Sequence, residues 1–183
     1  AMEDKMKYII PIIILSLVLF SCSKEEEGET DTTMSTPFVS DGTYKLTAAI
    51  QTVYYSNGTL YGSYTYSISH DSSVTPGYLA LDMEWKGSGV YRITSKGKAT
   101  LSVTGEDDVT IDCTSNAIDE LTFDTDGNMT KETVIQTGCG GNSSSLTEVS
   151  QKFTVVSGGF QVYIVLKDSD SNQFQITYTF QKQ

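Results

Sequence analysis

Among the side chains of this sequence, Cys113 and Cys139 are the clearest candidates for a chemical role. A catalytic dithiol is typically a Cys-x-x-Cys pair, and their spacing does not fit that motif. A zinc site would need further ligands, and the chain has a single histidine to supply one. In an exported protein, two thiols of this kind are typical of a disulfide, which would stabilise the fold by about 3–4 kcal/mol. We therefore expect a Cys113–Cys139 disulfide.

The histidine, His70, stands between Ser69 and Asp71 and so suggests a Ser-His-Asp relay. Successive side chains of a strand point to opposite faces, so three consecutive residues cannot meet in a triad. The sequence also lacks the G-x-S-x-G motif of a nucleophile elbow. We expect His70 to be a polar residue at a strand end.

Two acidic segments, 168–172 and 124–128, have the aspartate spacing of a calcium loop. A complete loop also has a glycine at its sixth position and an acidic residue at its twelfth, and neither segment has them. Such segments are more typical of turns in which Asp and Asn side chains bind their own backbone. No metal and no other cofactor is predicted.

Other carboxylates could form the acid pair of a glycoside hydrolase. The candidates are Asp82, Glu84, Glu106, Asp107, Asp108, Asp119 and Glu120. Nothing in the sequence indicates that any two of them converge, so we expect all seven on the surface. We predict no catalytic residues and no enzyme activity.

The composition excludes one large class of partner. The chain has 183 residues, with 12 Lys and Arg against 23 Asp and Glu, and a net charge of −11. Nucleic-acid binding needs clustered basic residues to neutralise phosphates, so no nucleic-acid partner is expected. The length allows one domain, or one domain with a tail. The oligomeric state is left open.

The N-terminal segment indicates export. Residues 8–20 form an apolar run that is too short for a membrane span of about 20 residues but typical of a signal-peptide core. The next residues complete the segment Leu19-Phe20-Ser21-Cys22, which resembles the lipobox of bacterial lipoproteins. The resemblance implies cleavage before Cys22 and attachment of lipid to this residue, and therefore a stable membrane anchor. Phe20 is bulkier than the family prefers at its position.

We expect three regions: a signal peptide at 1–21, a lipidated cysteine with a disordered acidic tether at 22–40, and a folded domain at 41–183. The segment Lys24-Glu25-Glu26-Glu27 resembles the acidic export signal of Bacteroidota-type lipoproteins. This resemblance implies a place in the cell envelope, on the outer membrane and displayed at the cell surface. Which leaflet carries the anchor is left open.

The folded domain is expected to be all-β, because apolar and polar residues alternate along most of it. Eleven strand segments are predicted, at 43–56, 59–70, 78–86, 89–95, 97–104, 108–113, 119–125, 128–137, 147–157, 160–167 and 173–182. One short helical turn is expected within 114–120. Tight turns between the strands predict an antiparallel meander that closes into an up-and-down β-barrel, with a β-sandwich as the alternative.

Each strand should present one apolar row to the interior. The expected rows are Tyr44/Leu46, Leu81/Met83/Trp85, Tyr91/Ile93, Leu101/Val103, Val109/Ile111, Leu121/Phe123, Phe153/Val155, Val162/Ile164/Leu166 and Phe174/Ile176/Phe180.

The residues 42–47, Gly-Thr-Tyr-Lys-Leu-Thr, resemble the opening of bacterial lipocalin-like domains. Further along, Cys113, the segments 119–123 and 126–128, and Cys139 resemble the middle of the same domains. Tyr44 departs from the pattern, because the family usually has a tryptophan there. The resemblance implies a lipocalin-like β-barrel on a lipid anchor, with a cup for a small apolar or amphipathic molecule.

The aromatic side chains expected to contact such a ligand are Tyr44, Tyr64, Tyr66, Trp85, Tyr91 and Phe123. Five tyrosines crowd the first predicted hairpin, and a row of this kind also suits cross-strand packing or sugar stacking. The alternative is therefore a module with a filled core whose outer face binds a glycan or an envelope protein.

Overall fold

The computed structural model describes residues 34–140 and 146–183, and every regular element within them is a strand. The nine strands are β1 (Gly42–Tyr54), β2 (Leu60–His70), β3 (Ala80–Gly87), β4 (Val90–Ser102), β5 (Val109–Phe123), β6 (Met129–Gln136), β7 (Thr147–Val156), β8 (Gly159–Lys167) and β9 (Gln173–Lys182). The prediction of an all-β antiparallel domain is confirmed. The predicted signal peptide and Cys22 lie outside the described residues.

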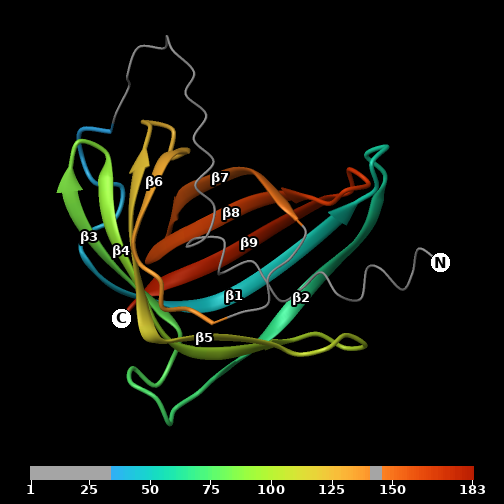
Figure 1. Cartoon of the computed structure of the whole chain (residues 1–183), viewed down its shortest axis with the longest axis horizontal. Coiled ribbons are helices and arrows are strands. Elements are labelled where there is room, and N and C mark those ends of the chain that lie inside the picture. Colours follow the sequence, from blue (N-terminus) through green and yellow to red (C-terminus); the bar gives the residue numbers. More distant parts are fainter. Residues whose placement is uncertain (1–33, 141–145) are drawn as a thin grey trace.

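The strands form one curled sheet in the order β6-β5-β4-β2-β1-β9-β8-β7, with every pair antiparallel (Figure 1). Strand β3 lies off this path and pairs with both β1 and β4. It pairs with the first residues of each strand, whereas β2 pairs with their later residues. Strands β2 and β3 thus share one place between β1 and β4, and the segment 71–79 connects them.

Strands β4 and β5 are each one continuous strand, where two shorter ones were predicted. The predicted breaks lie opposite each other at a bulge: Ser95 pairs with Ala117, and Gly97 pairs with Cys113. The helical turn expected within 114–120 is wrong, because residues 114–116 are the extra length of the bulge and residues 117–120 pair with β4. Asn116 has a positive φ of 55°, which lets β5 bend there without ending.

The two ends of the sheet, β6 and β7, meet at one described point. Asn128 and Lys152 form an isolated antiparallel bridge, and the Phe153 N–H donates to the Gly127 carbonyl at 2.8 Å. Gly127 has a φ of 80°, and a Cβ there would lie 2.3 Å from the Phe153 carbonyl oxygen. Only glycine therefore allows the edges to approach this closely. We call this contact and the adjoining edges of β6 and β7 the seam.

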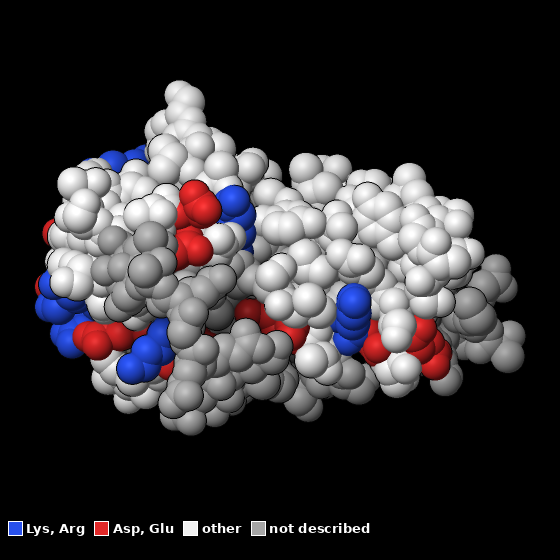
Figure 2. All heavy atoms as spheres, turned by 90° about the horizontal axis from the view of Figure 1, so that it is seen from above, with Lys and Arg blue, Asp and Glu red and all other residues white. Residues whose placement is uncertain are grey.

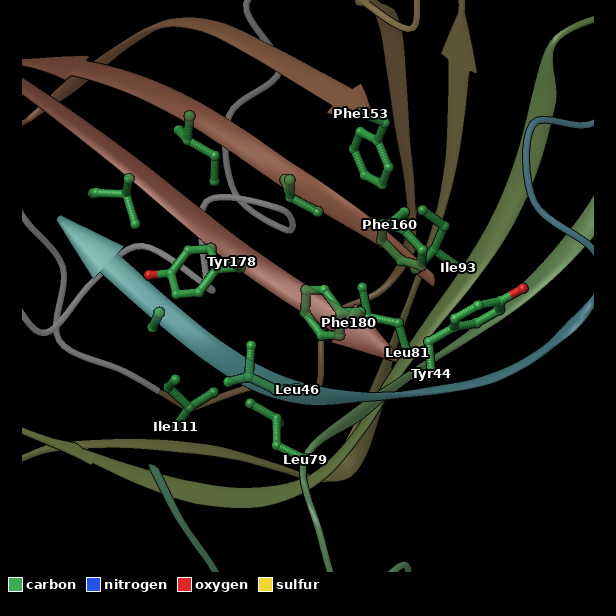
Figure 3. Close-up of a cluster of buried hydrophobic side chains, with 14 of the residues drawn as sticks. Tyr44, Leu46, Leu79, Leu81, Ile93, Ile111, Phe153, Phe160, Tyr178 and Phe180 are labelled. Atoms are coloured by element: carbon green, nitrogen blue, oxygen red, sulfur yellow. The ribbon is translucent and has the colours of Figure 1, made fainter. Parts of the chain in front are cut away.

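The core lies on the concave face of the curled sheet. Phe153, Phe160 and Phe180 form a row across β7, β8 and β9, with neighbouring ring centroids 5.5 and 5.3 Å apart (Figure 3). Most predicted inward residues are buried, as expected from their alternation. Val155 is an exception at 53% exposed, because β7 ends the sheet path and β8 is the one strand with an extended pairing to it.

The segment 34–40, expected to belong to the tether, packs against the core. Met34 and Val39 are buried, and the Phe38 ring lies 4.8 Å from that of Tyr91. The Tyr91 hydroxyl donates to the Val39 carbonyl at 2.9 Å and accepts from the Val39 N–H at 3.2 Å. The folded domain therefore includes residues 34–40, which precede the predicted boundary at Asp41.

The expected pairing of Cys113 and Cys139 is present, with the sulfur atoms at disulfide distance. The Gly140 N–H also donates to the Asp112 carbonyl at 2.6 Å. The two contacts hold the segment after β6 against β5.

Candidate functional site

Three carboxyl side chains approach one another on the inner face near the seam. Asp119 of β5 lies on the same face as Leu121 and Phe123, and it is buried, at 2% exposed. Glu132 of β6 pairs with Leu121 and so shares this face. Glu148 of β7 pairs with the buried Leu166 of β8, which places it on the inner face as well. We call Asp119, Glu132 and Glu148 the acid cluster.

Burial makes all three acids hard to ionise, and repulsion from the other two adds to this effect for Glu132. Burial raises the pKa of Asp119 to about 7 and that of Glu148 to about 7. It also raises the pKa of Glu132 to about 8, and the negative charges of Asp119 and Glu148 add to this shift. The repulsion indicates that Glu132 lies within electrostatic reach of both other acids.

Several polar atoms of this region lack a partner among the described residues. They are Asp119 Oδ1, Glu132 Oε1, Glu148 Oε2, Ser95 Oγ, and both Oε1 and Nε2 of Gln151. Gln151 is 4% exposed, so its whole amide group is shielded from solvent without a hydrogen bond to this part of the chain. Buried polar groups are paired in the great majority of cases, so this concentration requires an explanation.

Strand register places Gln151 beside the acid cluster. The inward side chains of β7 are Glu148, Gln151 and Phe153, which pair with Leu166, Ile164 and Val162 of β8. Phe153 packs against Phe123 of β5 at 4.6 Å. Strand β5 pairs antiparallel with β6, and the single Asn128–Lys152 bridge next to the start of β6 is antiparallel too, so β5 and β7 run in the same direction, and Gln151 lies between Phe153 and Glu148 on the inner face of β7. Gln151 therefore lies between the aromatic contact and the three carboxyls.

Several other acids of β3, β5 and the nearby loops have basic partners. Glu120 pairs with Arg92 at 2.7 Å, Glu84 with Lys86 at 3.1 Å, and Asp82 with Lys96. On the face seen in Figure 2, charged side chains gather over the half of the molecule that contains β3 and β6, while the other half is mostly uncharged.

The surface position expected for Asp119 is wrong. Asp119 is two and four residues before Leu121 and Phe123, and alternate residues of a strand share a face. This spacing in the sequence could have indicated that Asp119 points inward. Glu132, Glu148 and Gln151 were missed. Bulges beside Asp119 and between Glu148 and Ser150 interrupt the alternation of their strands, so the sequence pattern does not assign a face to them.

Four of the six predicted ligand-contacting residues belong to one aromatic cluster. The Tyr91 ring lies 4.9 Å from Trp85 and 6.1 Å from Phe123, and Phe123 contacts Phe153. Tyr44 joins this cluster through Phe160, at 5.1 Å, and Phe160 in turn stacks on Phe153. The cluster thus extends to Phe153, which is two residues from Gln151 on the inner face of β7.

The other two predicted residues, Tyr64 and Tyr66, lie on β2. The Tyr66 hydroxyl donates to Gln51 Oε1 at 2.6 Å, and burial raises its pKa well above the usual range. Tyr66 is also close enough to the buried Tyr178 to raise the pKa of that phenol further. Tyr66, Gln51 and Tyr178 thus form a second polar site within the sheet, in which Tyr66 and Gln51 are hydrogen-bond partners.

The two acidic segments are turns, as interpreted from the sequence. Asp124 Oδ1 accepts from the backbone N–H groups of Asp126 and Asn128, and Asp124 Oδ2 accepts from the Asn128 amide. The segment 168–172 repeats the same three hydrogen bonds. The first aspartate of each segment therefore accepts hydrogen bonds from the backbone of its own turn.

His70, the last residue of β2, contacts β1 and the residue before β3. Its Nδ1 accepts from the Leu79 N–H at 3.2 Å, so its Nε2–H donates to the Leu46 carbonyl at 3.0 Å. Burial lowers the pKa of the ring, and the charge of Lys45 lowers it further. His70 is therefore a neutral connection between β1, β2 and the start of β3, which agrees with the structural role expected for it.

In the described ranges, no three side chains of His, Cys, Asp and Glu are placed to hold a metal ion. The same ranges contain no helix that is long and apolar enough to cross a membrane. Comparisons with protein-family models, curated proteins and solved structures found no match.

Proposed function

We propose that this chain is a non-enzymatic binding protein that holds a small amphipathic molecule within a β-barrel. The path of the sheet has eight positions, β1 pairs with β9 along most of its length, and the sheet ends touch at the seam. These features support a lipocalin-like up-and-down barrel over a β-sandwich.

The polar groups without partners carry this proposal. A filled apolar core has no need for Gln151, Asp119, Glu132 and Glu148 on its inner face, and leaving such groups unpaired costs about 1–3 kcal/mol each. An amphipathic ligand would satisfy them with its polar group and place its apolar part along the inward rows. Ligand sites combine these two features, a mostly apolar lining and a few convergent polar groups.

One alternative function has its own support. The row Phe153, Phe160 and Phe180 fills part of the interior with packed rings. On the hairpin between β1 and β2, the rings of Tyr55 and Tyr61 are in edge contact, and Leu60 is 55% exposed. A module with a filled core could use this hairpin to bind a glycan or an envelope protein.

Ligand binding can be tested through Trp85, the single tryptophan, which packs on Tyr91 within the aromatic cluster. A panel of fatty acids, alcohols, amines, sterols and isoprenoids is added to the purified chain while tryptophan emission and heat of binding are measured. We expect saturable binding of at least one amphiphile with a stoichiometry of one. Failure of the whole panel would contradict the proposal and favour recognition at the Tyr55–Tyr61 hairpin.

The anchor is a second part of the proposal, and its support comes from the sequence of residues 6–22. Lipid on Cys22 would hold the protein at the outer membrane of the cell envelope, with the acidic segment that follows directing it to the surface. Replacing Cys22 with alanine should move the protein from the membrane fraction to the soluble fraction. A Cys22→Ala protein that stays in the membrane and still takes up labelled lipid would contradict the anchor.

A further inference from the structure

We infer that the polar group of the bound molecule is an organic cation, an ammonium or a guanidinium, and that Asp119, Glu132, Glu148 and Gln151 bind it. This inference rests on the proposed ligand-binding function and specifies the chemical class of the ligand.

The first argument is the chemical character of the site. Three carboxyl groups from β5, β6 and β7 share the inner face, and each has an oxygen without a hydrogen-bond partner in the described part of the chain. Carboxylate oxygens accept hydrogen bonds, and an ammonium or guanidinium offers several N–H donors on one positive charge. The unpaired acceptors and the donors of an organic cation are therefore complementary.

The second argument is Gln151, which is independent of the acids. Its amide is almost fully buried, both polar atoms lack a described partner, and the register of β7 with β8 places it on the inner face, as the next inward residue after Glu148. A glutamine amide can accept one N–H from a cation and donate to a neighbouring carboxylate. Gln151 would thus hold the ligand and fix the orientation of one acid.

The third argument is the placement of basic side chains. Lys131 and Lys152 adjoin Glu132 and Gln151 in sequence, but both are exposed and alternate to the opposite face. The ion pairs of Arg92, Lys96 and Lys98 go to Glu120, Asp82, Asp71 and Asp112. No described basic side chain forms an ion pair with the acid cluster, so an external cation would neutralise it.

Other polar groups fit this site less well. An anionic head group has no N–H donor for the carboxyl oxygens and would be repelled by each acid that is ionised, and a neutral alcohol offers a single O–H donor to several unpaired acceptors. A metal ion needs ligands that converge on one point, and the described acids do not do so. An organic cation spreads its donors over a larger volume than a metal ion and suits acids held on three different strands.

The test compares three ten-carbon amphiphiles that differ only in the polar group: decylammonium, decanol and decanoate. Calorimetric titration of the full chain should give one saturable decylammonium site, with at least tenfold tighter binding than decanol or decanoate. The isosteric double variant Glu132→Gln/Glu148→Gln should lose at least tenfold in decylammonium affinity and keep its affinity for decanol. Circular dichroism checks that the variants fold.

The matched control is Glu120→Gln, one residue from Asp119 but on the opposite face and paired with Arg92. It should leave decylammonium binding unchanged, which separates the acid cluster from the general negative charge of the protein. If decanol or decanoate binds as tightly as decylammonium to the unaltered chain, the inference is overturned while the proposed function stands. An amine preference that survives the double variant also overturns it. If none of the three binds while another amphiphile of the panel does, the inference is overturned and the proposed function stands; failure of the whole panel overturns both.

Discussion

Gly127 is the residue on which contact between the sheet ends depends most directly. Its φ of 80° is strained for other residues, and a side chain there would meet the Phe153 carbonyl. We expect Gly127→Ala to lower the free energy of unfolding, because it combines backbone strain with a clash at the seam. Urea denaturation measures this loss.

Gly58 provides the matched control for this substitution. It has a similar φ of 82°, but nothing lies within 4 Å of the position that a Cβ would occupy. Gly58→Ala therefore carries the backbone strain alone, and Gly127→Ala should cost about 1–3 kcal/mol more. Equal costs for the two variants would show that the close approach of Gly127 and Phe153 does not contribute to stability.

At the scale of the element, β5 combines a bulge with the disulfide. Cys113 is fully buried, and its bond to Cys139 holds the segment after β6 in place. We expect the double variant Cys113→Ala/Cys139→Ala to lose about 3–4 kcal/mol of stability in the chain-entropy description. In exported protein, thiol labelling under denaturing, non-reducing conditions should modify neither cysteine. Labelling of both would argue against the disulfide.

The elements also show how far the sequence predicts this molecule. Regular alternation correctly placed β1, β3, β8 and β9, because one-residue slips there would expose a whole apolar row. It failed at the bulge of β4 and β5, where extra residues imitate a break between strands. It also located β6 and β7, predicted at 128–137 and 147–157, but bulges and exposed edges weaken the alternation there, so the inward-facing polar residues of these strands were not recognised. The unpredicted part of the candidate site, Glu132, Glu148 and Gln151, lies on these two strands.

For the whole molecule, the acid cluster should make stability depend on pH in an unusual direction. Folding raises the pKa values of Asp119 and Glu148 to about 7 and that of Glu132 to about 8, so the folded state binds protons more tightly than the unfolded state. Stability is therefore highest where the acids are protonated and falls as the pH rises through these values. We expect a loss of about 1–2 kcal/mol between pH 7 and pH 8.5.

The stability measurements are compared above pH 7, because the titration of His70 changes stability with pH in the opposite direction. The pKa of His70 is lowered in the folded state, so its contribution is lost as the pH falls below the ordinary histidine value. Denaturation at several pH values measures the slope. Glu132→Gln should flatten it between pH 7 and 8.5, and Glu120→Gln should leave it unchanged. A slope that Glu132→Gln does not alter would contradict the burial of this acid.

The central claim is that a small amphipathic molecule binds inside the sheet, next to the acid cluster. A crystal structure of the full chain saturated with decylammonium tests it most directly. We expect density for the ligand on the inner face, with its nitrogen in hydrogen-bond contact with Gln151 and at least one of Glu132 and Glu148. Saturated crystals in which water alone contacts the Gln151 amide and the acids, or in which decylammonium lies on the outer face, would contradict the account.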